Sequence, residues 1–130
     1  MNERQRYPSG VDAPYVAVIM AAHNRVELTT RALKALKSQE VDVRYHVFLV
    51  DDGSSDGTAD AARALMGSLI TVKTGGGDLF WAKSMAAAEE LAMASGPFDY
   101  LLWLNDDTFL RPLALARMIS VAVERGNRAA

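Results

Sequence analysis

The sequence predicts an α/β fold of three layers (α/β/α), in which a mainly parallel sheet is covered by helices on both sides. Four short apolar segments alternate with four segments whose apolar residues recur at the spacing of an amphipathic helix. The short segments are apolar throughout, which is typical of parallel strands that are buried on both faces. Regular alternation of such strands and helices is the pattern of proteins with a parallel sheet.

Each element can be given an expected range. Strands are expected at residues 15–21, 45–50, 69–72 and about 100–104. Helices are expected at residues 25–39, 58–66 and 81–94. Asn24 is the expected N-cap of the first helix, and a final helix is expected to have Pro112 in its first turn.

Composition favours a single domain and excludes one class of partner. The chain has 130 residues, half of them hydrophobic, which is enough for one core. We place the domain at residues 15–130, after a polar lead-in at 1–14. Fourteen basic and sixteen acidic residues give a net charge of −2 without a long block of either sign. A nucleic-acid partner, which needs a basic surface, is therefore not expected.

Composition also predicts a location. The chain has no cysteine, which suits a reducing compartment. Its polar start lacks the apolar stretch of a signal peptide, and no apolar run approaches the roughly eighteen residues of a membrane span. We therefore expect a cytoplasmic protein. An alternative is that a full-length enzyme contacts a membrane surface through parts outside this chain.

Polar residues follow each of the four predicted strands. They are Ala22-His23-Asn24, Asp51-Asp52-Gly53, Gly75-Gly76-Gly77-Asp78 and Asn105-Asp106-Asp107. In open parallel sheets, ligands bind outside the carboxyl ends of the strands. We therefore expect the functional site where these four segments meet.

The segment Asp51-Asp52-Gly53 has two interpretations. An Asx turn that leads into the second helix explains the acids and the glycine without any ligand. Alternatively, one carboxylate accepts a hydrogen bond from the imide N–H of uracil or thymine, while Gly53 lets the base approach the backbone. The residues alone leave both interpretations open.

The segment Asn105-Asp106-Asp107 predicts a cation site. Mg²⁺ and Mn²⁺ prefer oxygen ligands and often take only one or two from protein, with phosphates and water as the others. An aspartate at the end of a strand meets that need, and its neighbour can reach a ribose hydroxyl. The alternative is that the acids cap the helix that follows.

The three glycines at 75–77 allow close backbone approach or form a flexible loop. They do not match a P-loop, because no Gly-Lys-Ser/Thr follows, nor a dinucleotide fingerprint, because the third glycine is missing. His23 shows no metal-ligand spacing with the other histidine and is expected to be structural. Phe80 and Trp81 either stack on a base or sugar, or belong to the core.

With these segments in order, the chain resembles the nucleotide-binding half of a family 2 glycosyltransferase with the Rossmann-like GT-A fold. The matching segments are residues 18–25 (VIMAAHNR), 50–58 (VDDGSSDGT) and 103–108 (WLNDDT). The resemblance covers about residues 15–122. The segment GGDLFW at 76–81, together with NDDT, is most similar to the rhamnosyltransferase-like branch of that family.

The resemblance implies roles in nucleotide binding. Ala21 and His23 would line the nucleobase pocket, and Asp52 would bind the pyrimidine N3–H. Gly53 and Gly76 are assigned to the same nucleotide site.

The resemblance also implies a metal. Asp106 would bind the ribose, and Asp107 would hold the Mn²⁺ or Mg²⁺ ion that binds the diphosphate. Asn105 stands where the family's Asp-x-Asp motif has its first acid, which leaves one negative charge fewer near the diphosphate.

A full enzyme of this family would transfer the sugar of a UDP- or dTDP-linked donor to a hydroxyl of an acceptor saccharide or lipid-linked glycan, with inversion. Because 23 residues follow Asp107, the acceptor site and the catalytic base are expected in a missing part of the enzyme. The chain alone is expected to bind the donor and to transfer little sugar. It is also expected to self-associate through surface that the missing part would cover.

Three alternative interpretations exist for the same sequence. A sugar-nucleotide nucleotidyltransferase would need a glycine-rich basic loop after the first strand, where residues 21–25 read AAHNR. A signalling receiver domain would need its pair of acids at that same place. A non-catalytic nucleotide-binding or interaction module has no sequence feature that separates it from part of an enzyme.

Overall fold

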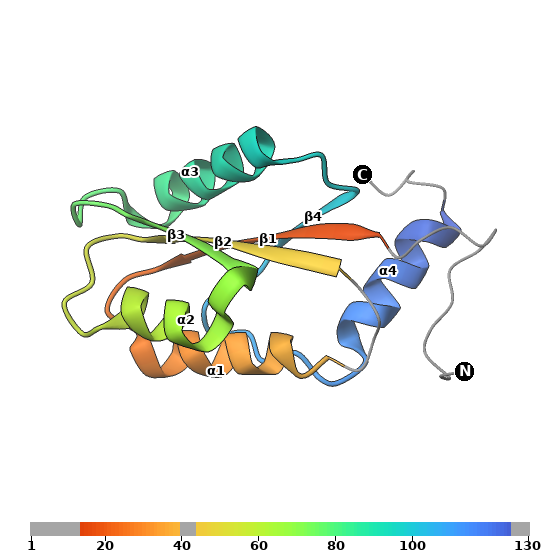
Figure 1. Cartoon of the computed structure of the whole chain (residues 1–130), viewed down its shortest axis with the longest axis horizontal. Helices are drawn as coiled ribbons and strands as arrows, with labels where there is room; N and C mark the ends of the chain where they lie inside the picture. The colour runs from red at the N-terminus through yellow and green to blue at the C-terminus, as the bar shows by residue number, and fades with distance from the viewer. Residues whose placement is uncertain (1–13, 40–43, 126–130) are drawn as a thin grey trace.

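The computed structural model describes residues 14–39 and 44–125. Its centre is a four-stranded sheet in the order β3-β2-β1-β4, and every neighbouring pair is parallel. The strands are β1 (Tyr15–Ala22), β2 (Arg44–Asp51), β3 (Ile70–Thr74) and β4 (Tyr100–Trp103). The helices are α1 (Val26–Lys37), α2 (Thr58–Met66), α3 (Phe80–Ser95) and α4 (Ala114–Glu124), as drawn in Figure 1.

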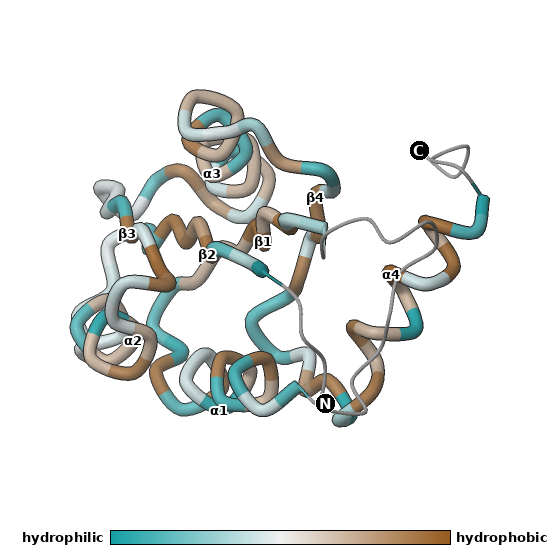
Figure 2. The backbone as a smooth tube through the Cα atoms, turned by 45° about the vertical axis from the view of Figure 1, so that its right-hand side comes forward, coloured by the Kyte–Doolittle hydropathy of each residue, from teal (hydrophilic) through white to brown (hydrophobic). Residues whose placement is uncertain are grey.

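The central strand β1 separates two cores. Val16 and Val18 belong to the core shared with α1, α2 and α4, whereas Ala17 and Ile19 belong to the core under α3. Figure 2 shows α3 on one side of the sheet and α1 and α2 on the other. The unbroken apolar run of β1 therefore reflects burial on both faces, and the predicted three-layer α/β fold is confirmed.

The predicted cap of α1 was wrong. Arg25, not Asn24, occupies the N-cap position, and it makes no side-chain cap bond. The N–H of Val26 instead donates to Oδ2 of Asp56 at 3.0 Å. Asn24 is unsuited to the cap because its backbone is left-handed, at φ 49°, and its side chain bonds to the loop after β2.

Several predicted boundaries also differ by one or two residues, and two of them have a clear structural reason. Leu69 belongs to a short 3-10 turn, η2 (Gly67–Leu69), so β3 begins one residue later. Pro112 lies before α4 instead of in its first turn, because the N–H of Ala114 donates to Arg111 O and closes a turn there. No helix within the described ranges is both long and apolar enough to cross a membrane.

The edge strand β4 has an exposed face. Leu101 and Trp103 stand opposite Ala17 and Ile19 of β1, on the α3 side of the sheet, and are 42% and 53% exposed. Trp103 packs edge-on against Trp81 of α3, with 6.0 Å between ring centres. This is apolar surface of the kind that the predicted self-association needs, and self-association stays a prediction.

Candidate functional site

The carboxyl ends of the strands meet at one edge of the sheet. Backbone hydrogen bonds continue past the strands there, from Asp52 N–H to Ala22 O at 2.9 Å and from Gly75 N–H to Asp51 O at 2.8 Å. The loops after β1, β2 and β3 therefore begin side by side. This edge is where an open parallel sheet places its ligands.

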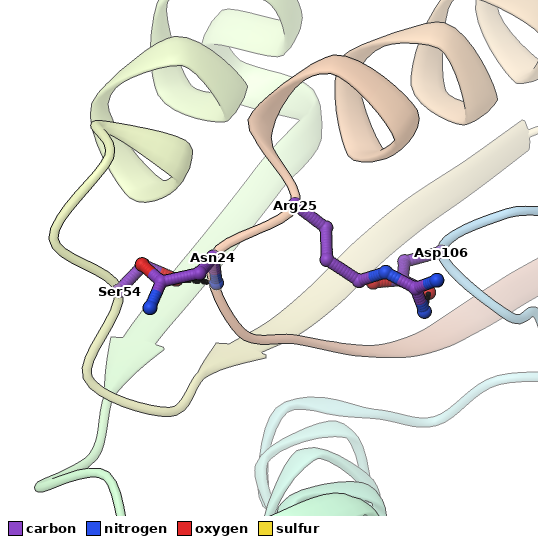
Figure 3. A network of polar contacts seen from close by, with 4 residues as sticks. All are labelled: Asn24, Arg25, Ser54 and Asp106. Carbon is purple, nitrogen blue, oxygen red and sulfur yellow. Dashed lines mark hydrogen bonds and ion pairs between the residues drawn. The ribbon is translucent and has the colours of Figure 1, made fainter.

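Side chains tie the loop after β1 to the loop after β2. Oδ1 of Asn24 accepts a hydrogen bond from Ser55 N–H, and Asn24 N–H donates to Ser54 Oγ, both at 2.7 Å; Figure 3 shows Asn24 beside Ser54. The Ser54 hydroxyl donates in turn to Asp51. Asp51 is thus a turn residue, as in the interpretation that needs no ligand.

Asp56 binds the first residues of two helices. Its carboxylate accepts the N–H of Val26 in α1 at 3.0 Å, the N–H of Thr58 in α2 at 3.1 Å, and the Thr58 hydroxyl. The bond from the Thr58 hydroxyl is the largest cause that lowers the pKa of Asp56; burial opposes it, and the backbone bonds add to it. A carboxylate at two helix N-termini also interacts favourably with both helix dipoles.

Asp52 holds the glycine-rich loop. It is 3% exposed, and its carboxylate accepts the N–H of Gly77 at 2.8 Å and those of Leu79 and Phe80 at 2.9 Å. Burial is the largest single influence and would raise the pKa of Asp52, but these three bonds and the nearby His23 together lower it. Because a carboxylate has about four acceptor positions, these three bonds leave one unused.

His23 is exposed and hydrogen-bonded. Its Nδ1 lies 2.5 Å from the carbonyl oxygen of Asp52, and its Nε2 lies 3.4 Å from Nδ2 of Asn24. Since a carbonyl oxygen only accepts, Nδ1–H is the donor of the first bond. The ring joins the ends of β1 and β2, as expected of a structural histidine.

Gly53 lies directly against the glycine-rich loop. It has φ +73°, and a Cβ at this position would be 2.8 Å from Gly77 N and 2.9 Å from Gly77 Cα. Two backbones approach this closely only where a side chain is absent.

We predict that Gly53→Ala destabilises the protein more than Gly57→Ala. Both glycines have positive φ, +73° and +86°, but a Cβ at Gly57 would meet nothing within 4 Å. The left-handed backbone costs alanine about 1–2 kcal/mol at either position, and the clash with Gly77 should add roughly 1–3 kcal/mol. Urea unfolding of the two variants measures the difference. Equal losses would contradict the close contact between the two loops.

The strand ends surround a cavity of about 310 Å³, at the lower end of the roughly 300–1,000 Å³ typical of small-molecule sites. The lining residues are Ala21, Ala22, His23, Arg25, Asp52, Gly77, Phe80, Trp81, Ser84 and Asp106. Four residues assigned from the sequence, Ala21, His23, Asp52 and Asp106, are thus brought together. The mainly apolar wall with a few polar side chains is typical of ligand sites.

Three assigned residues do not line the cavity. Gly53 packs against Gly77, and Gly76 is exposed beside it, so that Gly77 is the glycine in the wall. Asp107 is exposed and has no hydrogen bond or ion pair with another described residue.

The sequence reasoning anticipated part of one wall of the cavity and missed the rest. Phe80 and Trp81, expected to stack on a base or sugar or to belong to the core, line the cavity and are 74% and 53% exposed, so they are not core residues. Ser84, which lies beside them in the first turns of α3, was missed. Residues four apart on a helix share a face, so the spacing of Phe80 and Ser84 was a usable signal. Arg25 gave no comparable signal, because its partner is distant in sequence.

Arg25 and Asp106 form an ion pair in the cavity wall (Figure 3). Nη1 of Arg25 lies 3.2 Å from Oδ1 of Asp106, and their side chains are 46% and 10% exposed. Burial raises the pKa of Asp106; Arg25 partly offsets this effect, and the neighbouring Asp107 adds to it. A buried acid with a perturbed pKa in a cleft is a candidate functional group.

A divalent cation would need few protein ligands here. Within the described ranges, no group of three or more histidine, aspartate or glutamate side chains could hold a metal ion. Mg²⁺ and Mn²⁺ often take only one or two carboxylates and complete their shell with phosphates and water. Asp107, an exposed carboxylate next to the buried Asp106, fits that requirement.

Comparison with known proteins gives a sequence match to one family. The family model described as "Glycosyl transferase family 2" matches residues 17–130. No curated protein matches the chain.

Solved structures of similar fold include the mannosyltransferase PcManGT from Pyrobaculum calidifontis, in complex with GDP-Man and Mn2+. The TM-score with this structure is 0.69 at 21% sequence identity, and the match covers 92% of this chain and 35% of that one. S. aureus TarS 1-349 in complex with UDP-GlcNAc has a TM-score of 0.74 at 18% identity, over 87% and 32%. The chain therefore spans about a third of the length of these structures.

Proposed function

Because the chain belongs to glycosyl transferase family 2 and shares its fold with solved GT-A structures, we propose that it binds the nucleoside diphosphate of a sugar donor. The observation that carries the proposal is the cavity at the carboxyl edge of the sheet. Its wall combines Asp52, which has one unused acceptor position, with the ion pair of Arg25 and Asp106. The similar structures named above hold GDP-Man and UDP-GlcNAc.

We assign the base to the Asp52 side of the cavity. The remaining acceptor position of this carboxylate suits the N3–H of uracil or thymine. Ala21 and His23 from the end of β1, and Gly77 from the glycine-rich loop, complete the wall around it. Gly77 has no side chain, so a flat base can approach its backbone.

We assign the ribose to Asp106 and the diphosphate to its neighbours. The Asp106 carboxylate can accept hydrogen bonds from ribose hydroxyls, and Arg25 places a positive charge in the same wall. Asp107 would hold Mg²⁺ or Mn²⁺. When bound, such an ion supplies positive charge to the departing diphosphate.

The chain's part in the reaction is to hold the leaving group. In a longer enzyme, the sugar would pass to a hydroxyl of an acceptor saccharide or lipid-linked glycan in one inverting displacement, assisted by a base from elsewhere in that enzyme. We propose that the donor is UDP- or dTDP-linked and that the enzyme belongs to the rhamnosyltransferase-like branch. Leu101 and Trp103 would be covered by the remainder of the enzyme, or by a second copy of the chain when the remainder is absent.

The test is a comparison of UDP with CDP. The two nucleotides have nearly the same size, but uracil presents an N3–H where cytosine presents an unprotonated N3. If Asp52 accepts from the base, UDP should bind at least about tenfold more tightly than CDP in calorimetric titrations with Mg²⁺. Equal affinities would remove Asp52 from base recognition. Absence of binding by UDP and dTDP alike would overturn the proposed function.

A further inference from the structure

Ser84 carries a buried hydroxyl without a partner. The residue is 1% exposed and lines the cavity, and its Oγ has no hydrogen-bond partner among the described residues. Buried polar atoms are nearly always hydrogen-bonded, because leaving one unpaired is costly. Since Ser84 lines the cavity, a ligand in that cavity is a candidate partner for this hydroxyl.

Two other helical hydroxyls of this protein bond to the preceding turn. Thr30 Oγ1 donates to Val26 O, and Ser95 Oγ donates to Leu91 O, both at 2.8 Å. This bond to the carbonyl four residues earlier is the usual arrangement for serine and threonine in helices. Ser84 in α3 does not make it, so its donor and its acceptor positions are both unused.

The other buried polar side chains of the cavity wall are already engaged. Asp52 binds the backbone of the glycine-rich loop, and Asp106 binds Arg25. Among the buried side chains that line the cavity in the described part of the chain, the hydroxyl of Ser84 is the group whose hydrogen-bonding capacity is wholly available.

We infer that Ser84 is a nucleotide-positioning residue, whose hydroxyl hydrogen-bonds to the nucleoside part of the donor; this inference rests on the proposed function. A neutral hydroxyl suits the carbonyl and hydroxyl groups of a base or ribose. The diphosphate needs positive charge, and in the same site Arg25 and a cation at Asp107 would supply it. The nucleoside would therefore lie between α3 and Asp106, and the phosphates toward Arg25 and Asp107.

The test compares Ser84→Ala with a matched control, Thr29→Val. Thr29 in α1 has the other buried hydroxyl without a partner in the described ranges, and it does not line the cavity. Competition against a fluorescent UDP analogue gives the affinities for UDP and UMP, and thermal unfolding gives the stability of the free proteins. Ser84→Ala should weaken UDP and UMP equally, by about tenfold. Its Tm should be unchanged or higher, because the variant loses only an unpaired hydroxyl, and Thr29→Val should keep both affinities.

The outcomes separate this inference from the proposed function. If wild type binds UDP and Ser84→Ala binds it equally well, the inference is overturned and the proposed function stands. If Ser84→Ala loses affinity for UDP but not for UMP, the contact is with the diphosphate, and the inference is also overturned. A lower Tm in Ser84→Ala, with equal affinity losses in Thr29→Val, would make the role of Ser84 purely structural. A wild type that does not bind UDP would overturn both.

Discussion

Replacing Asp52 with alanine is expected to release the glycine-rich loop and to abolish nucleotide binding. The carboxylate is the partner of the N–H groups of Gly77, Leu79 and Phe80. Without it, these donors lose their hydrogen bonds, and α3 loses the anion at its N-terminus. Gly53 also packs on this loop, so the disturbance would spread to the turn after β2. The cavity wall would then lack a fixed shape.

Amide hydrogen exchange measures this effect at the three donors. In Asp52→Ala, protection at Gly77, Leu79 and Phe80 should fall to that of an open loop. In Asp52→Asn, protection should be intermediate between wild type and Asp52→Ala, because the amide NH₂ of asparagine would face at least one backbone N–H. Asp78→Asn removes an exposed acid from the same loop and should leave protection unchanged. Full protection in Asp52→Ala would contradict the role given to this carboxylate.

Acid should act on the loop through the same carboxyl. The folded-state pKa of Asp52 lies below its ordinary value of 3.8, so the ionised form is favoured by folding. That stabilisation is fully present above the ordinary pKa and is lost as pH falls through the lowered pKa. Protection of the loop in wild type should therefore be constant near neutral pH and decline only below about pH 4.

The architecture was predictable because apolar periodicity reports which faces are buried. The expected strand at 15–21 is β1 (Tyr15–Ala22), and the expected helix at 58–66 is α2 (Thr58–Met66). In both cases the apolar residues end where turn-forming residues begin. The position of the polar segments at one edge of the sheet follows from the parallel arrangement of the strands.

The contacts between loops were not predictable, because periodicity does not say which distant side chain completes a bond. Arg25 and Asp106 are 81 positions apart, and their pairing depends on how the loops after β1 and β4 lie. Asp56, from the loop after β2, accepts the N–H at the start of α1. Asn24, which was the expected N-cap of α1, instead accepts the N–H of Ser55. The Ser84 hydroxyl makes no hydrogen bond with another described residue, and no sequence pattern predicts that absence.

Replacing Asp107 with alanine is expected to remove the metal-dependent part of nucleotide binding without affecting the fold. The side chain is exposed and has no partner among the described residues, so the Tm of the free protein should not change. Loss of a carboxylate ligand should weaken binding in the presence of metal by at least about tenfold, since even outer-shell changes typically cost that much. Glu90→Gln removes an exposed acid on α3 and should leave metal-dependent binding intact.

The most direct measurement of the central claim is a calorimetric titration of wild type and Asp107→Ala with UDP, each with and without Mn²⁺. We predict that Mn²⁺ strengthens UDP binding to wild type by at least about tenfold. The variant should show the same weak affinity in both conditions. If Mn²⁺ makes no difference to wild type, or strengthens binding equally in the variant, then Asp107 does not hold a diphosphate through a cation, and the account of this site is contradicted.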